Sequence, residues 1–92
     1  MRRDTRYDIE PMSQRGKLFQ AIRNNPRDVR LEDACKAAQA LGFVHTGGKG
    51  AHLAYSRTGE PVALNFQNDG NGKIPPYQAR QLIGMIEKYA DE

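Results

Sequence analysis

The sequence predicts an α+β domain of two layers, in which helices cover one face of a three-stranded antiparallel sheet. Two segments carry apolar residues at helical spacing, and between them the chain holds short segments in which apolar and polar residues alternate. Turn-rich stretches separate these short segments, so consecutive strands are expected to form a meander. A chain of 92 residues suits one domain with a modest core. The second face of the sheet is therefore expected to be open.

The net charge of +3 comes from the N-terminal third of the chain. Residues 1–30 carry eight basic and four acidic groups, residues 31–73 carry four of each, and residues 74–92 carry two basic and three acidic groups. Few apolar side chains lie in residues 1–12, which we expect to form a mobile arm ahead of a single domain over residues 13–92. A basic arm suits contact with phosphate or an acidic partner, and equally a solvated tail.

Two helices are predicted before the sheet. Ser13 is a suitable N-cap for a short helix that ends at Asn25, immediately before a proline. A second helix is predicted over residues 31–41, where apolar residues recur at i, i+3, i+4, i+7 and i+10, and Gly42 follows as a C-terminal cap. Cys35 is the single cysteine and lies among alanines on the apolar stripe, so we expect it to be a small core residue.

Three strands are predicted, over residues 43–46, 52–56 and 61–67, with a glycine-rich loop at 47–50 and a hairpin loop at 57–60. Side chains alternate between the two faces of a strand. The apolar face is expected to carry Leu53, Tyr55, Val62, Leu64 and Phe66. His52 is thereby predicted on the open face, beside Lys49 and Arg57 and near the amides of Asn65 and Gln67.

The last helix is the clearest amphipathic segment of the chain. It follows a turn-rich loop over residues 68–73 and begins at Pro75 and Pro76, whose missing N–H groups cost nothing in a first helical turn. Its apolar stripe is expected to be core. The stripe comprises Ala79, Leu82, Ile83, Ile86 and Ala90. The first turn is expected to face solvent or a protein partner, and it carries Tyr77, Gln78 and Arg80.

Several classes of function lack their residue patterns. His45 and His52 have no cysteines or carboxylates at the spacing of a zinc site, and residues 47–50 lack the spacing of a phosphate-binding loop. We therefore expect no metal and no cofactor. No apolar run has the length of a membrane span or a secretory signal, so a cytoplasmic protein is expected.

One reaction suits a site with a single histidine. RNA carries its own nucleophile, the 2′-hydroxyl, so strand cleavage needs in-line geometry, a proton-transfer group and stabilisation of charge. One imidazole contributes roughly 10²–10⁴-fold by general acid–base catalysis. Lys49 and Arg57 could stabilise the charge that develops on phosphorus. On this pattern alone, His52 is more often structural than catalytic, and His45 is expected to be an ordinary strand residue.

The chain also resembles the HicA family of bacterial toxins, and in particular its longer members. The matching segments are Leu41-Gly42-Phe43, Lys49-Gly50-Ala51-His52, Asn65-Phe66-Gln67, Gly72-Lys73 and Pro76-Tyr77-Gln78-Ala79-Arg80-Gln81-Leu82. The resemblance extends from about Pro26 to Tyr89. Its most specific functional piece is Lys-Gly-x-His, and the Pro-Tyr-Gln block is the more specific sign of membership.

The resemblance implies a fold similar to double-stranded-RNA-binding domains, in the order α-β-β-β-α, with the helix at residues 13–25 as an addition. It also implies metal-independent cleavage of mRNA by His52 and neutralisation by a HicB-type antitoxin. The family usually has serine directly before this histidine, whereas this chain has Ala51. Loss of that hydroxyl would weaken activity if it orients the imidazole or binds phosphate.

Two classes of function follow. The first is an endoribonuclease toxin with His52 as general acid or base; the second is a non-catalytic RNA- or protein-binding module on the same fold, which Ala51 favours. The residues expected to contact RNA are Lys49, Gly50, Arg57, Asn65, Gln67 and Lys73. For the charged members, and equally for Asn65 and Gln67, an ordinary solvated side chain is the alternative interpretation.

Overall fold

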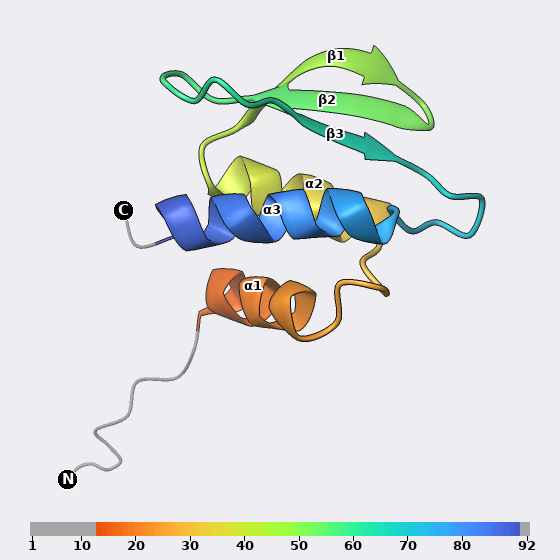
Figure 1. Cartoon of the computed structure of the whole chain (residues 1–92), viewed down its shortest axis with the longest axis horizontal. Helices are drawn as coiled ribbons and strands as arrows, with labels where there is room; N and C mark the ends of the chain where they lie inside the picture. The colour runs from red at the N-terminus through yellow and green to blue at the C-terminus, as the bar shows by residue number, and fades with distance from the viewer. Residues whose placement is uncertain (1–12, 91–92) are drawn as a thin grey trace, which may run out of the picture.

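A computed structural model describes residues 13–90 of the chain. The protein has an α+β fold with three helices and a three-stranded antiparallel sheet (Figure 1). The arm predicted for residues 1–12 lies outside the described residues. The elements are α1 (Gln14–Asn24), α2 (Leu31–Ala40), β1 (Val44–Lys49), β2 (His52–Ser56), β3 (Leu64–Gln67) and α3 (Pro76–Tyr89). The strands lie in the order β1-β2-β3, as expected for a meander.

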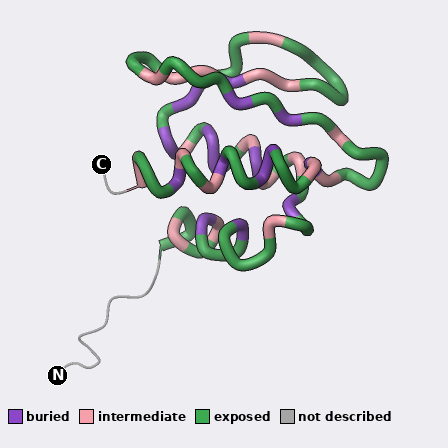
Figure 2. The backbone as a smooth tube through the Cα atoms, in the orientation of Figure 1, coloured by how far each residue is buried: buried purple, intermediate pink, exposed green. Residues whose placement is uncertain are grey.

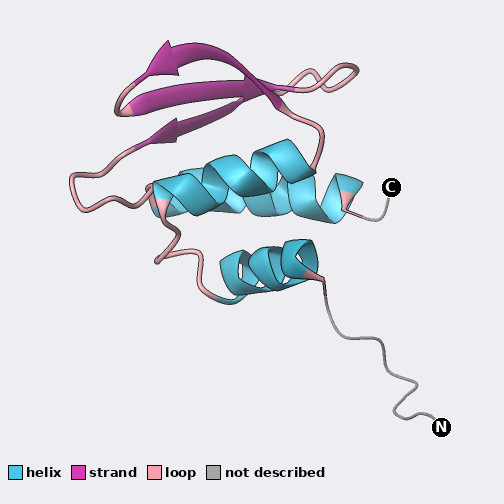
Figure 3. Ribbon diagram, turned by 180° about the vertical axis from the view of Figure 1, so that it is seen from behind, coloured by secondary structure: helices cyan, strands magenta, loops and turns pink. Residues whose placement is uncertain are grey.

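The helices α2 and α3 lie side by side under one face of the sheet, and nothing in the described chain covers the other face (Figures 1 and 3). The prediction that helices cover one face is therefore confirmed. The helix α1 packs on α2 and α3 from the side away from the sheet, so it adds a third layer to the two that we predicted. This helix does not reach the open face of the sheet.

Local sequence signals set the ends of the first two helices. The Gly16 N–H donates to the Ser13 Oγ at 3.0 Å, which confirms Ser13 as the N-cap of α1. Gly42 follows α2 with φ of +88°, a left-handed conformation that glycine adopts without the steric cost of a Cβ. Cys35 is half-buried and packs against the core.

The core lies between the sheet and the helices α2 and α3, and it continues between these helices and α1, from which Phe19 and Ile22 are buried (Figure 2). Small side chains on α2 allow close approach of the neighbouring elements, because alanine adds little bulk to a helix face. The α2 residues that solvent does not reach are Ala34, Ala37 and Ala38. From α3 the fully buried residues are Ala79, Leu82 and Ile86, and the strands add Tyr55, Leu64 and Phe66.

The strand boundaries differ from the prediction at two places. Gly47 and Gly48 belong to β1, so the expected glycine loop is only a two-residue turn at Gly50 and Ala51. The third strand begins at Leu64 and not at residue 61, and the Val62 side chain is 45% exposed instead of buried. The Val62 N–H donates to the Glu60 carboxylate at 3.0 Å, and Glu60 in turn accepts from Lys88 of α3 at 2.7 Å, so this segment is held in a loop.

Within the described residues, none of the helices combines the length and the apolar character that crossing a membrane requires.

Candidate functional site

A row of three polar side chains crosses the open face of the sheet at one end. Lys49 is directly opposite His52 in the β1–β2 pair, and His52 is directly opposite Gln67 in the β2–β3 pair. Residues that oppose each other in antiparallel strands project from the same face, with Cα atoms about 5 Å apart. The three side chains therefore lie next to one another, and we call them the Lys49–His52–Gln67 row.

The row faces solvent. Lys49, His52 and Gln67 are all exposed, whereas the alternate residue Tyr55 is buried and Leu53 is half-buried against the core. The prediction that His52 stands on the open face is confirmed. Asn65 is also exposed, and it opposes Ala54 two residues further along the same face. The structure thus brings together four of the predicted contact residues, since Gly50 adjoins Lys49 in the turn.

The turn that presents the row depends on glycine. Gly48 has φ of +78°, and a Cβ at this position would clash with the His52 carbonyl oxygen. Gly50 has φ of +66° and faces open space. On the far side of the turn, the Asn68 N–H donates to the Ala51 carbonyl oxygen at 2.9 Å. The backbone on both sides of His52 is therefore held by its neighbours.

The two histidines lie on opposite faces of the sheet. His45 opposes Tyr55, and their rings lie 5.5 Å apart, centroid to centroid. The His45 Nε2 is 3.1 Å from the Gly48 carbonyl oxygen. An irregularity in β1 between His45 and Gly47 sends the Thr46 hydroxyl towards Ser56, with 3.3 Å between the two oxygens. His45 consequently has no place in the Lys49–His52–Gln67 row, although it is equally exposed.

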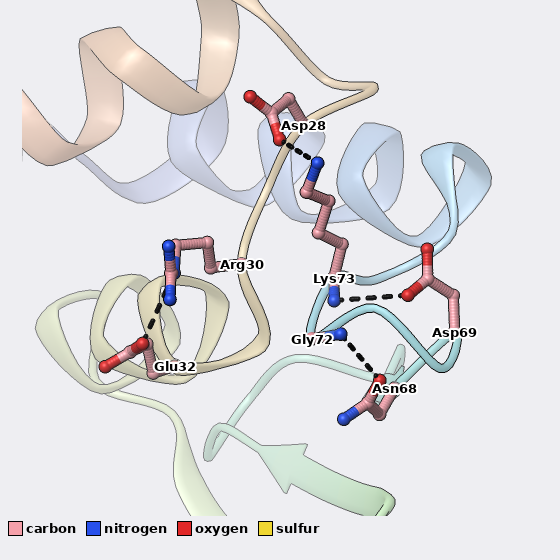
Figure 4. A network of polar contacts seen from close by, with 7 residues as sticks. All are labelled: Asp28, Arg30, Glu32, Asn68, Asp69, Gly72 and Lys73. Carbon is pink, nitrogen blue, oxygen red and sulfur yellow. Dashed lines mark hydrogen bonds and ion pairs between the residues drawn. The ribbon is translucent and has the colours of Figure 1, made fainter.

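Lys73 makes its contacts with the loop before α3 and with the connector between α1 and α2 (Figure 4). Its ammonium nitrogen is 2.7 Å from the Asp28 carboxylate in the connector between α1 and α2, and this contact lowers the pKa of Asp28. Its backbone N–H donates to the Asp69 side chain at 3.2 Å, while Asn68 accepts from the Gly72 N–H at 3.0 Å. Hydrogen bonds within the loop at residues 68–73, together with the ion pair to the connector, hold this loop in place. Lys73 therefore has a structural role there.

Arg57 lies at the other end of β2, and the expectation that it stands beside His52 is wrong. A strand rises by about 3.3 Å per residue, so the five residues from His52 to Arg57 separate the two by roughly 16 Å. The Arg57 guanidinium carbon lies 3.6 Å from the centroid of the Tyr89 ring in α3. Arg57 therefore contacts the helix layer and does not extend over the open face.

Gln78 supports the row from α3, where the sequence predicted a different position for it. Gln78 was expected to face solvent, but it is only 5% exposed, and its Oε1 accepts from the Gln67 backbone N–H at 2.8 Å. The signal was present in the spacing, because Gln78 precedes Leu82 by four residues and therefore shares its helix face. Its Nε2 donates to the Tyr77 hydroxyl at 3.3 Å. The first turn of α3 is thereby joined to the end of β3.

Searches for related proteins found no match to this chain among protein-family models, curated proteins or solved structures. The described residues contain no cluster of three or more histidine, cysteine or carboxylate side chains that could hold a metal ion. What the row itself offers is one imidazole, one ammonium group and one amide on an open surface. This combination can transfer a proton, compensate negative charge and donate a hydrogen bond.

Proposed function

We propose that this protein is an endoribonuclease that cleaves mRNA without a metal ion, with His52 as the general acid or base. The observation that carries the proposal is the Lys49–His52–Gln67 row, in which an exposed imidazole lies directly between a cation and an amide. A phosphodiester that crosses the strands at this row would meet all three groups at once.

The reaction is a transesterification. The ribose 2′-oxygen attacks the adjacent phosphorus and loses its proton, while the bond from phosphorus to the 5′-oxygen breaks and that oxygen gains a proton. His52 carries out one of these proton transfers. The Lys49 ammonium group compensates the negative charge that grows on the phosphoryl oxygens, and Gln67 donates a hydrogen bond to the same group. The products are a 2′,3′-cyclic phosphate and a 5′-hydroxyl.

The resemblance to HicA toxins leads to the same assignment from a different direction. The element order α2-β1-β2-β3-α3 is the order expected for a fold similar to double-stranded-RNA-binding domains, with α1 as the addition. We accordingly propose that the chain is the cytoplasmic toxin of a toxin–antitoxin pair and that a HicB-like protein neutralises it. Its Lys49-Gly50-Ala51-His52 segment forms the β1–β2 turn and the start of β2, where the proposed chemistry takes place.

A non-catalytic RNA- or protein-binding module is the second candidate. It is favoured by Ala51, which is exposed beside His52 and offers no hydroxyl where the family has serine. It is also favoured by the composition of the row, which includes a single imidazole and no carboxylate.

The test is cleavage of RNA by the purified protein and by a His52→Ala variant in the presence of a chelator. The parent is expected to leave 2′,3′-cyclic phosphate ends, and the variant is expected to be slower by roughly 10²–10⁴-fold. His45→Ala is the matched control, because His45 is exposed on the same sheet but on the other face, and it should cleave like the parent. Equal rates for parent and His52→Ala would refute the assignment, whereas cyclic ends lost with His52 would exclude the binding module.

A further inference from the structure

An exposed aromatic side chain lies at the start of α3, after the loop that leads from the Gln67 end of β3, and it has no part in the proposed proton transfer. Tyr77 is 59% exposed at the start of α3. Of the three large apolar side chains that are exposed in the described part of the chain, it is the only aromatic one; the others are Val44 and Val62. An exposed aromatic ring offers a flat apolar surface on which another flat group can stack.

The structure links Tyr77 to the backbone at the end of β3. The nearly buried Gln78 donates to the Tyr77 hydroxyl at 3.3 Å and accepts from the Gln67 N–H at 2.8 Å. Gln67 is the member of the row that faces His52 across β2 and β3. A single side chain thus connects the exposed ring to the strand end that carries the proposed site.

Charge around the ring favours a polyanion. Arg80 follows Tyr77 by three residues on α3, a spacing that places two helical side chains next to each other, and it is exposed. The first turn of α3 carries no acidic residue, so the positive end of its helix dipole is not compensated by side-chain charge there. An aromatic ring next to a guanidinium group is the combination with which proteins bind unpaired nucleotides.

We propose that Tyr77 is a base-stacking platform at the end of the sheet that carries the Lys49–His52–Gln67 row, and that the protein takes single-stranded RNA as its substrate. The choice of RNA as the ligand rests on the proposed function. A base can stack on Tyr77 only when it is unpaired. The three strands carry a single lysine or arginine, Lys49, which leaves the open face without the several phosphate contacts that a duplex groove requires. The likeness to a duplex-binding fold concerns architecture and does not determine the ligand.

Binding of a fluorescently labelled single-stranded RNA tests this inference, in the His52→Ala background so that the RNA is not consumed. Tyr77→Ala is expected to weaken binding about 10- to 100-fold, as removal of one stacking partner does. Tyr77→Phe is the matched control: it loses the bond to Gln78 but keeps the ring, and it should bind within about twofold of the parent background. Val44→Ala removes an equally exposed apolar side chain at the opposite end of the sheet face and should have no effect.

Two further measurements separate stacking from a structural or electrostatic role. The salt dependence of binding should be the same for Tyr77→Ala and the parent background, whereas Arg80→Ala should reduce the slope by about 0.7, as loss of one phosphate contact with a single strand does. Thermal unfolding of Tyr77→Ala should match that of the parent background. A duplex of the same sequence should bind more weakly than the single strand.

Several outcomes would overturn the inference. Equal binding by Tyr77→Ala would leave this ring as a contact for a protein partner, and equal binding of duplex and single strand would remove the preference for unpaired bases. Absence of binding to either RNA would also overturn it. Because the measurement uses the His52→Ala background, the stacking result holds even when the cleavage assay contradicts the catalytic assignment.

Discussion

At the His52 end of β2, charged and polar side chains project into solvent, whereas at the Ser56 end they are bound by α3. Lys49, His52 and Gln67 are exposed and lie in one row across the sheet. Beyond Ser56, Arg57 lies over the Tyr89 ring, and the loop that follows is anchored by Glu60. Two hairpin ends of similar composition thus have different roles, one open to a ligand and one stabilising the fold.

Glu60 shows how the second end is stabilised. Its side chain is 1% exposed, and its Oε1 accepts from the Lys88 ammonium group at 2.7 Å and from the Tyr89 hydroxyl. Its Oε2 accepts from the Val62 N–H at 3.0 Å. These contacts, of which the Lys88 bond contributes most, lower the pKa of Glu60 to about 2. Both oxygens of this carboxylate therefore bind groups of the protein itself. The side chains at the His52 end, in contrast, remain exposed to solvent.

The largest expected effect is on catalysis and concerns the two cations. Lys49→Ala should lower the cleavage rate by about 100-fold, or about 2.7 kcal/mol, because the charge on phosphorus loses its cation. Arg57→Ala should leave the rate unchanged and reduce the free energy of unfolding by about 1 kcal/mol, through loss of the contact with Tyr89. Cleavage assays and urea titrations of both variants measure these effects. An Arg57→Ala variant with a reduced cleavage rate and an unchanged free energy of unfolding would contradict the roles that we assign to the two ends.

A second comparison concerns the glycines of the two hairpins. Gly48→Ala should reduce the free energy of unfolding by about 2 kcal/mol or more, because φ is positive and the Cβ would meet the His52 carbonyl oxygen. Gly59→Ala has the same unfavourable φ, at +86°, but open space around it, so a loss of about 1 kcal/mol is expected. Urea unfolding of the two variants provides the measurement. Equal losses would mean that the close approach at Gly48 relaxes at no cost.

The last effect is visible in acid. The pKa of Glu60 in the folded protein lies below its ordinary value of 4.5, so this carboxylate stabilises the fold above about pH 4.5, and the contribution is lost as the pH falls towards 2. Glu60→Gln should therefore be less stable than the parent at neutral pH, and the difference should shrink below pH 4.5. Urea unfolding across this range measures it, with Glu87→Gln on the exposed side of α3 as the control. A difference that stays constant with pH would contradict the ionic role of Glu60.

Local patterns predicted most of the fold. The Ser13 cap, the stripes of α2 and α3 and the alternation around Leu53 and Tyr55 each depend on residues a few positions apart, and each is confirmed. The placement of His52 on the open face follows from the same alternation, because a strand residue next to two core-facing neighbours must point the other way.

The failures share a physical cause, which is contact between segments distant in sequence. Gln78 is buried because the end of β3 needs an acceptor for the Gln67 N–H, and Val62 is exposed because Glu60 is anchored to α3. Distance in sequence also hid the ion pair of Lys73 with Asp28, which lies 45 positions earlier in the chain.

The sequence by itself therefore determined the class of fold and the face of the sheet that carries His52, since periodicity is a property of neighbouring residues. Only the tertiary structure decided which charged groups stand beside that histidine. A cation becomes part of an open site or of an internal contact according to what the folded chain brings within a few ångströms of it. Lys49, which lies opposite the first residue of β2, and Arg57, which follows its last residue, show the two outcomes.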